Sequence, residues 1–311
     1  MKKSFKGHSF KNFLLKLIAF FAVVYVADFA IGLFLKKFYF KQQSGYDYLT
    51  TYSIEKTKAD VLVFGSSRAV NIFNTQIFEN KLGLSCYNAG RYGEPVFYHY
   101  AVLKGVLKRY TPKIILLSFD AGNFNKSQEA YDRLAVLLPY YGNHPEIRQM
   151  AELKGPYEKL KLLSKIYPYN SLLLPIITGN TAYSKRKYVN FNGFIPAKTM
   201  FTGPLQIFDY TKEKELDSLK IDVYRSFIRD CISLNIQLYI VCPPYMINPI
   251  GTDHSIIAGK QIAQEYNIKF LDYSRDSFFI DKPALFADYR HLNERGVEIF
   301  SNMVIEKMNN P

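Results

Sequence analysis

The 311-residue sequence has few of the residues that build covalent or metal-stapled frameworks, since it contains only three cysteines. An odd number of cysteines without C-x-x-C spacing argues against both a disulfide framework and a zinc site. Cys86 and Cys242 lie in apolar, strand-like runs, where a buried thiol behaves as a small hydrophobic side chain. We interpret Cys231 in the same way. No His, Cys and Asp residues have the spacing of metal ligands, and we expect no metal or other cofactor.

The sequence also lacks a dense basic tract, although its formal net charge is +13 and its pI is near 9.4. The Lys and Arg residues are spread along the chain, without zinc-finger spacing, so we expect no binding to nucleic acid. The positive charge instead favours a membrane face or a polyanionic polymer. Hydrophobic residues make up 48% of the chain and charged residues 22%, which is enough apolar material for a buried core.

A long apolar run near the N-terminus predicts a membrane anchor at residues 17–35, interrupted only by Asp28. Nineteen helical residues at about 1.5 Å each nearly span a hydrocarbon core roughly 30 Å thick. Lysines flank the run on both sides, with more before it than after it: Lys2, Lys3, Lys6, Lys11 and Lys16 precede it, and Lys36, Lys37 and Lys41 follow it. This bias predicts that residues 1–16 are cytoplasmic and that the rest of the chain lies outside.

Two other interpretations of this run are less favoured. A cleaved signal peptide has a shorter apolar stretch and a cleavage site of small residues, whereas this run leads straight into Lys36 and Lys37. A buried core helix would not carry basic flanks. Asp28 would cost about 3 kcal/mol at this depth if ionised. It is either protonated or turned toward a partner helix.

After a polar linker at residues 36–57, residues 58–311 show a regular alternation of strand-like and helical stretches. The expected strands are short apolar runs at 60–64, 85–88, 113–119, 237–242 and 268–273, and the expected helices lie at 93–110, 213–234 and 293–308. Strands that alternate with helices indicate right-handed crossovers and a parallel sheet. The sequence therefore predicts an α/β domain: a flavodoxin-like, three-layer α/β/α sandwich with about five parallel strands.

Residues at about 124–210 do not fit this alternation and predict an inserted cap. The segment is rich in Pro, Gly, Tyr and Lys, with YPYN at 167–170 and YSKRKY at 183–188. A long insertion in a compact domain is typically a functional lid rather than a bare loop. Its tyrosines can either stack on sugar rings or pack half-buried, and the sequence favours neither.

Polar and glycine residues follow the first three predicted strands, at the edge where ligand sites of parallel sheets lie. Gly65-Ser66-Ser67-Arg68 follows the first strand. A serine there either caps a helix or presents its hydroxyl to a cleft beside backbone N–H groups. Asn88-Ala89-Gly90 follows the second strand and offers a further N–H. Residues 120–123 follow the third, as a turn or as a line of oxyanion donors.

A hydroxyl nucleophile needs a base, and the base needs an acid that orients it and stabilises its protonated form. Asp288 and His291 lie three residues apart, before the last helix, and can meet on one face of a turn. The remaining histidines lack such a setting: His8, His99, His144 and His254. A Gly-Ser turn, a Gly, an Asn and a late Asp-x-x-His thus occur in that order.

In this order of blocks the chain resembles the SGNH (GDSL-like) hydrolases, and it looks closest to a membrane-anchored branch with Gly-Ser-Ser in block one. That branch includes proteins of teichoic-acid D-alanylation and of polysaccharide O-acetylation. The resemblance covers residues 58–125 and 235–310. It implies Ser67 as nucleophile, His291 as general base and Asp288 as its orienter. The oxyanion hole would comprise the Ser67 and Gly90 N–H groups and Asn123.

The chain departs from the family pattern at two blocks. Ser66 replaces the usual Asp of block one, and Phe124 stands where block three has Asp, so Asp120 remains an alternative to Asn123. Arg68, which replaces the usual Leu, Asn88 and Asp120 are further candidates for contacts with the substrate.

The resemblance implies a serine esterase or acyltransferase that acts on O-acyl groups, such as acetyl, of an envelope polysaccharide outside the bacterial inner membrane. Sequence does not separate hydrolysis from transfer. The expected partners are membrane lipid around the anchor, the O-acylated polymer and a membrane acyltransferase. Two alternatives remain: a lipid esterase or thioesterase at the membrane surface, and a non-catalytic scaffold of an envelope-modification complex.

Overall fold

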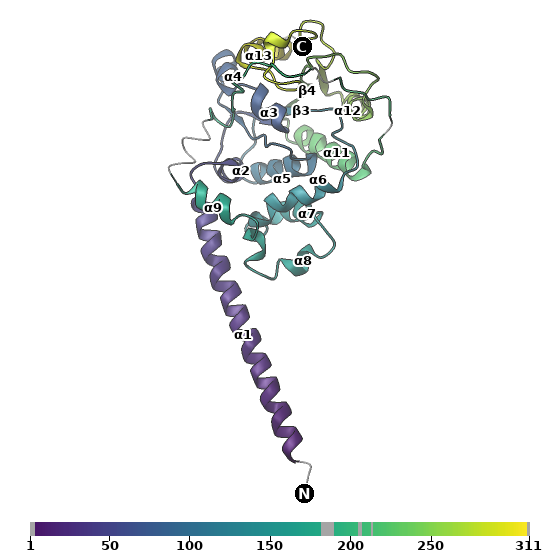
Figure 1. Cartoon of the computed structure of the whole chain (residues 1–311). Coiled ribbons are helices and arrows are strands. Elements are labelled where there is room, and N and C mark those ends of the chain that lie inside the picture. The colour runs from purple at the N-terminus through teal and green to yellow at the C-terminus, as the bar shows by residue number, and fades with distance from the viewer. Residues whose placement is uncertain (1–3, 182–189, 205–206, 213, 310–311) are drawn as a thin grey trace.

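A computed structural model describes residues 4–181, 190–204, 207–212 and 214–309 of the chain. Lys2, Lys3 and the predicted YSKRKY motif at 183–188 lie outside the described residues. Figure 1 shows a globular α/β body from which one long helix, α1, projects.

The body contains a five-stranded, all-parallel sheet in the order β2-β1-β3-β4-β5. The strands are β1 (Val61–Phe64), β2 (Cys86–Asn88), β3 (Ile114–Ser118), β4 (Gln237–Cys242) and β5 (Lys269–Asp272). This order and the helices on both faces confirm the predicted flavodoxin-like sandwich. Because all strands run in parallel, their carboxyl ends meet at one edge, where Gly65, Ala89, Phe119 and Pro243 continue the chain.

Alternate strand residues bury into two separate cores. Leu62 and Phe64 face one core, which α5 (Val96–Leu107), α11 (Ser218–Ser233) and α12 (His254–Glu265) cover. Val61 and Val63 face the other, beneath α3 (Ser67–Ile72), α4 (Thr75–Leu82) and α13 (Glu294–Asn309). Figure 1 shows α3, α4 and α13 on one side of the sheet and α5 and α11 on the other. Helices α4 and α12 were not predicted from the sequence, although the Asp253 side chain caps the start of α12.

Helix α1 (Ser4–Lys41) is longer than the predicted anchor at 17–35, and residues 10–41 of it are apolar and long enough to cross a membrane. The last turns are not a linker, because Leu35 and Tyr39 are buried. The Tyr39 ring packs against Tyr140 and Tyr169, and its hydroxyl bonds that of Tyr140 at 3.1 Å. Helix α2 (Tyr46–Glu55) occupies most of the remaining linker. Apolar and aromatic contacts thus fix residues 36–57 to the body.

Short helices and turns build the cap. They are α6 (Gln128–Asp132), η1 (Arg133–Tyr140), η2 (Pro145–Ile147), α7 (Arg148–Glu152), α8 (Glu158–Lys161), η3 (Tyr167–Tyr169) and α9 (Leu173–Gly179), where η marks a 3-10 helix. They pack on α5 and along α1. Within YPYN, Tyr169 is buried and the Tyr167 hydroxyl donates to Glu158 at 2.7 Å. These two tyrosines therefore take the packing role rather than the sugar-stacking role.

Asp28 contacts the cap instead of a partner helix. Its carboxylate accepts hydrogen bonds from the Ser164 hydroxyl at 2.5 Å, the Lys165 N–H at 2.7 Å and the Ile166 N–H at 3.3 Å. Three donors compensate a charge that the helix alone would leave among apolar neighbours.

Candidate active site

Ser67 lies at a tight turn that only glycine permits. Gly65 follows β1 with φ +139°, and a Cβ there would come within 2.6 Å of the Ser118 Cβ and 2.9 Å of the Ala69 Cβ. The chain then enters α3, whose first residue is Ser67. A helix-start N–H has no intrahelical acceptor. The turn therefore sets both the hydroxyl and the N–H of Ser67 at the carboxyl edge of the sheet.

The structure brings Ser67, His291 and Asp288 together although the other two lie 221 or more positions after the serine. The Ser67 Oγ lies 2.8 Å from His291 Nε2, and His291 Nδ1 lies 2.8 Å from Asp288 Oδ2. With Nδ1 protonated toward the carboxylate, Nε2 accepts the serine proton, which is the tautomer that a general base needs.

Asp288 is held ionised by its surroundings. Partial burial raises its pKa, but hydrogen bonds from the His291 ring and from the Arg290 and His291 N–H groups outweigh burial and bring the pKa to about 2. Its side chain is 46% exposed and that of His291 is 18% exposed. The pair is thus open to a substrate, and the carboxylate can stabilise an imidazolium over the whole neutral pH range.

Ser66 has a different partner. Its hydroxyl donates to Asp120 Oδ2 at 2.6 Å, and Arg68 Nη1 lies 3.2 Å from the other oxygen of that carboxylate. Arg68 also donates to the Pro244 carbonyl at 2.6 Å and lies 4.4 Å from the Tyr245 ring centre. Through these bonds Arg68 and Asp120 connect the turns after β1, β3 and β4. Because Arg68 is 2% exposed, it has this structural position rather than that of the accessible substrate contact that the sequence suggested.

The proposed oxyanion donors have different surroundings. The Gly90 N–H already donates to Asn88 Oδ1 at 3.0 Å. Asn88 is 1% exposed and its amide donates to the Ala69 and Phe73 carbonyls, so it supports α3 and does not reach a substrate. Asn123 lines a narrow cavity beside Gly65 and Ser66. The Ser67 N–H belongs to the first turn of α3, where backbone N–H groups have no intrahelical acceptor.

Several aromatic residues beside the triad were missed by the sequence analysis. Tyr245 packs on Phe208 from the cap, with ring centres 5.3 Å apart, and Phe208 packs on Tyr289 at 5.7 Å. The guanidinium of Arg290 lies 4.7 Å from the Phe208 ring centre. Tyr245 follows β4, so the strand-end rule applied to a fourth strand would have found it. Phe208 has no such signal, because only the folded cap brings it here.

Other groups considered in the sequence take structural positions. Cys86, Cys231 and Cys242 are buried and free, as expected. His99 is buried, and desolvation lowers its pKa to about 4, while His144 bonds Glu55 and Glu146. Among the described residues no group of three or more His, Cys, Asp or Glu side chains is arranged to hold a metal ion.

Comparisons with known proteins show little similarity in sequence. No family model and no curated protein matches the chain. Among solved structures, the crystal structure of an acetyl xylan esterase is 12% identical and has a TM-score of 0.40; the match covers 79% of this chain and 98% of that one. Similarity at this level indicates nothing about the activity of this chain.

Proposed function

We propose that the protein is a serine esterase or acyltransferase that forms an acyl-enzyme on Ser67. The hydrogen-bonded chain from Ser67 through His291 to Asp288, with both contacts at 2.8 Å, carries this proposal. A nucleophile, a base in the required tautomer and an ionised orienting acid are the three parts that acyl transfer through a serine needs.

In the proposed reaction the Ser67 Oγ attacks the ester carbonyl while its proton passes to His291 Nε2. The Ser67 N–H, and the Gly90 N–H after it leaves Asn88, stabilise the oxyanion of the tetrahedral intermediate. Collapse of the intermediate expels the alkoxide, which takes the proton from His291. Water or an acceptor hydroxyl then attacks the acyl-enzyme, His291 takes its proton, and Ser67 Oγ leaves with that proton.

The proposed substrate is an O-acyl group, such as acetyl, on an envelope polysaccharide outside the bacterial inner membrane. Helix α1 supports membrane anchoring, because it is long enough and apolar enough to cross a bilayer and its apolar residues are mostly exposed. The lysine bias before residue 17 supports an inside N-terminus. The partly exposed rings of Tyr210 and of Tyr289, the residue after Asp288, pack on the buried Phe208 and suit the apolar faces of sugar rings. A membrane acyltransferase remains the proposed partner.

The test is acetate release by the full chain in detergent from an O-acetylated polysaccharide, with a matched assay for acetyl transfer to a deacetylated acceptor. Release without transfer indicates a hydrolase, and transfer that outruns release indicates a transferase. If neither product appears with any acetylated glycan, while Ser67 still reacts with a small activated ester, the substrate assignment is wrong and the serine chemistry stands.

The alternative of a lipid esterase receives less support. The large apolar cavity beside α1 is lined by anchor and cap residues, and Ser67, Asp288 and His291 are not among them. A lipid in that cavity would not present its ester to Ser67.

A further inference from the structure

The lysines of α1 define how deep the helix would sit in a bilayer. Lys36 lies twenty positions after Lys16, which is about 30 Å of helix and matches the thickness of a hydrocarbon core. Lysines prefer the two interfaces, where their ammonium groups reach water. Lys16 and Lys36 would therefore mark the two boundaries of the core.

The cap touches α1 well inside this interval. Asp28 binds residues 164–166, and it lies eight residues, or about 12 Å, before Lys36. Lys165 packs so closely on Gly32 that a Cβ at residue 32 would lie 2.3 Å from the Lys165 Cβ. Irregular backbone occurs at membrane depth only where other protein groups satisfy it. The carboxylate of Asp28 does so for the N–H groups of Lys165 and Ile166.

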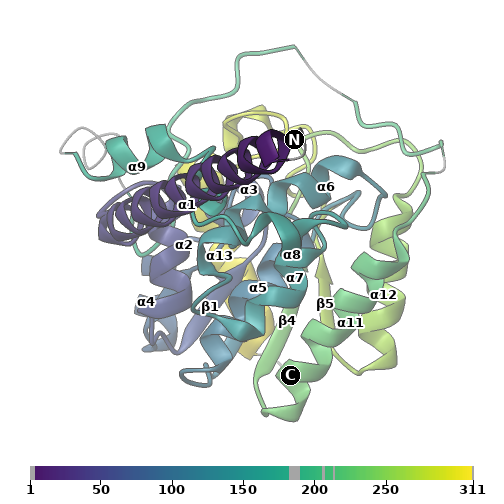
Figure 2. The ribbon, with the colours of Figure 1, turned by 90° about the horizontal axis from the view of Figure 1, so that it is seen from below.

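The surface of the cap next to α1 combines exposed aliphatic side chains with the exposed lysines Lys159, Lys161 and Lys165. Helices α8 and α9 lie on opposite sides of α1 when the body is viewed from below (Figure 2). Five aliphatic side chains in or beside these helices are 50–69% exposed: Leu160, Leu163, Leu173, Leu174 and Ile177. We call these five residues the cap underside. A group of this kind on a water-exposed surface indicates a contact with a partner or a membrane.

A cavity of about 500 Å³ lies between α1 and the cap. Phe29, Leu33 and Leu162 form part of its apolar wall, and Lys36, Arg148 and Lys165 contribute the charges. None of its lining residues is acidic. The volume falls in the range of small-ligand sites. Apolar walls with three cations match an amphiphile that has an anionic head.

We propose that the cap underside dips into the bilayer leaflet on the side of the catalytic body, and that this cavity binds an anionic glycerophospholipid of that leaflet. The phosphate lies near Lys36, Arg148 and Lys165, and an acyl chain follows Phe29 and Leu33 toward the bilayer centre. The inference rests on the proposed membrane anchoring but not on the proposed chemistry of Ser67. It would hold the catalytic body at a fixed height and tilt above the membrane.

Immersion of the cap underside can be measured with single tryptophans, because the chain contains none. Leu163→Trp, Leu174→Trp and the control Ile232→Trp on α11 are reconstituted at full length in vesicles with acyl-chain-brominated lipids. We expect bromine to quench the emission of the first two variants and to leave the third unchanged. If bromine left the emission of all three variants unchanged, the cap underside would not be immersed.

Lipid binding is measured by native mass spectrometry of the full chain in detergent with added phosphatidylglycerol or phosphatidylcholine. We expect one phosphatidylglycerol to be retained in preference, and the Arg148→Gln/Lys165→Gln variant to lose that preference by roughly tenfold. The control Arg229→Gln/Lys307→Gln removes two charges from α11 and α13 and should retain it. Gly142→Leu should also reduce binding, because a Cβ at this cavity-lining residue meets open space.

Equal retention of the two lipids, or no loss in the Arg148/Lys165 variant, would overturn the lipid site. A failure of membrane anchoring can be distinguished from a failure of the lipid site, because alkaline carbonate would then release the wild-type chain from membranes. Failure of the serine chemistry would leave all of these lipid results unchanged.

Discussion

Two polar clusters follow neighbouring strands of the same sheet, and they differ in almost every property that matters for catalysis. The first is the triad, Ser67 with His291 and Asp288, which is partly open to solvent. The second surrounds Arg91 after β2 and is buried. Arg91 lies 2.9 Å from Asp47 and 3.6 Å from Glu94, whose side chains are 6% and 4% exposed.

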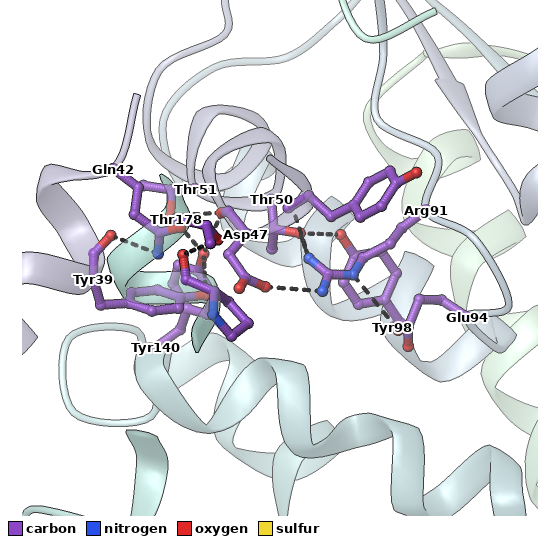
Figure 3. A network of polar contacts seen from close by, with 12 residues as sticks. Tyr39, Gln42, Asp47, Thr50, Thr51, Arg91, Glu94, Tyr98, Tyr140 and Thr178 are labelled. Atoms are coloured by element: carbon purple, nitrogen blue, oxygen red, sulfur yellow. Dashed lines mark hydrogen bonds and ion pairs between the residues drawn. The ribbon is translucent and has the colours of Figure 1, made fainter. Parts of the chain in front are cut away.

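The buried cluster joins three parts of the chain (Figure 3). Arg91 donates to the Thr50 hydroxyl at 2.7 Å, and Thr50 bonds Tyr98 at 2.8 Å. Thr51 bonds Tyr140 of the cap at 2.7 Å, and Tyr140 bonds Tyr39 at the end of α1. The cluster therefore links the anchor and the cap to the loop that carries Gly90.

The comparison shows that density of charge does not identify the reactive site. The buried cluster has more charged groups and no nucleophile next to an available base. In it, burial raises the pKa of Glu94 to about 7, against the attraction of Arg91 and Arg133. In the triad, hydrogen bonds overcome partial burial and lower the pKa of Asp288. The Arg91 cluster therefore has a structural role, whereas the triad keeps the Asp288 carboxylate ionised beside His291.

The largest expected effect is on the triad. His291→Ala should lower the kcat for acetate release by a factor of about 10³ or more, because Ser67 then has no proton acceptor. The thermal midpoint should change little, since His291 is partly exposed and its ring bonds only Ser67 and Asp288 among the described hydrogen bonds. A variant that keeps most of its kcat would show that His291 is not the base.

The buried cluster should respond in the opposite way. Arg91→Ala should reduce the free energy of unfolding by about 3–5 kcal/mol, because Asp47 would be left buried without its cation. Arg225→Ala, which breaks a partly exposed pair between Arg225 of α11 and Glu265 of α12, is the matched control and should cost less than about 1 kcal/mol. Chemical denaturation of the full chain in detergent measures both. Similar losses in the two variants would mean that the Arg91 cluster is not structural.

Glu94 should give stability a pH dependence of its own. Its pKa is about 7 when folded and 4.5 in the reference state, so the unfolded chain loses this proton first as the pH rises. Stability should fall between pH 4.5 and 7, by up to roughly 3 kcal/mol. The lowered pKa of Asp288 affects stability only below about pH 4, where stability falls as the pH falls. Thermal melts at several pH values should show that the stability of Glu94→Gln depends less on pH than that of the wild type. If the dependence were the same, a group other than Glu94 would cause it.

The smallest effect is expected at Ser66. Its hydroxyl bonds Asp120, which Arg68 also holds, so Ser66→Ala should keep kcat within about tenfold of wild type. The same acetate assay measures it. If this variant were as inactive as Ser67→Ala, the nucleophile would be reassigned by one residue.

The sequence predicted the sheet well because its strands are short, continuous apolar runs and its crossovers are helical. Ser67, His291 and Asp288 could be named because each lies next to a strand end or a helix start. The contacts of Asp28 and Phe208 could not, since the cap that surrounds them has no periodic pattern. Asn88 and Arg68 were assigned to substrate because sequence position does not show that their side chains turn inward and bond other parts of the chain.

Fluorophosphonate labelling of the full chain in detergent, with the modified residue mapped by mass spectrometry, directly tests whether Ser67 is an activated nucleophile. The full chain is needed because Leu35 and Tyr39 are buried in the body. We expect an adduct on Ser67 that persists in Ser66→Ala and disappears in His291→Ala. An adduct on another serine, or Ser67 labelling that does not depend on His291, would mean that Ser67 is not activated by this triad.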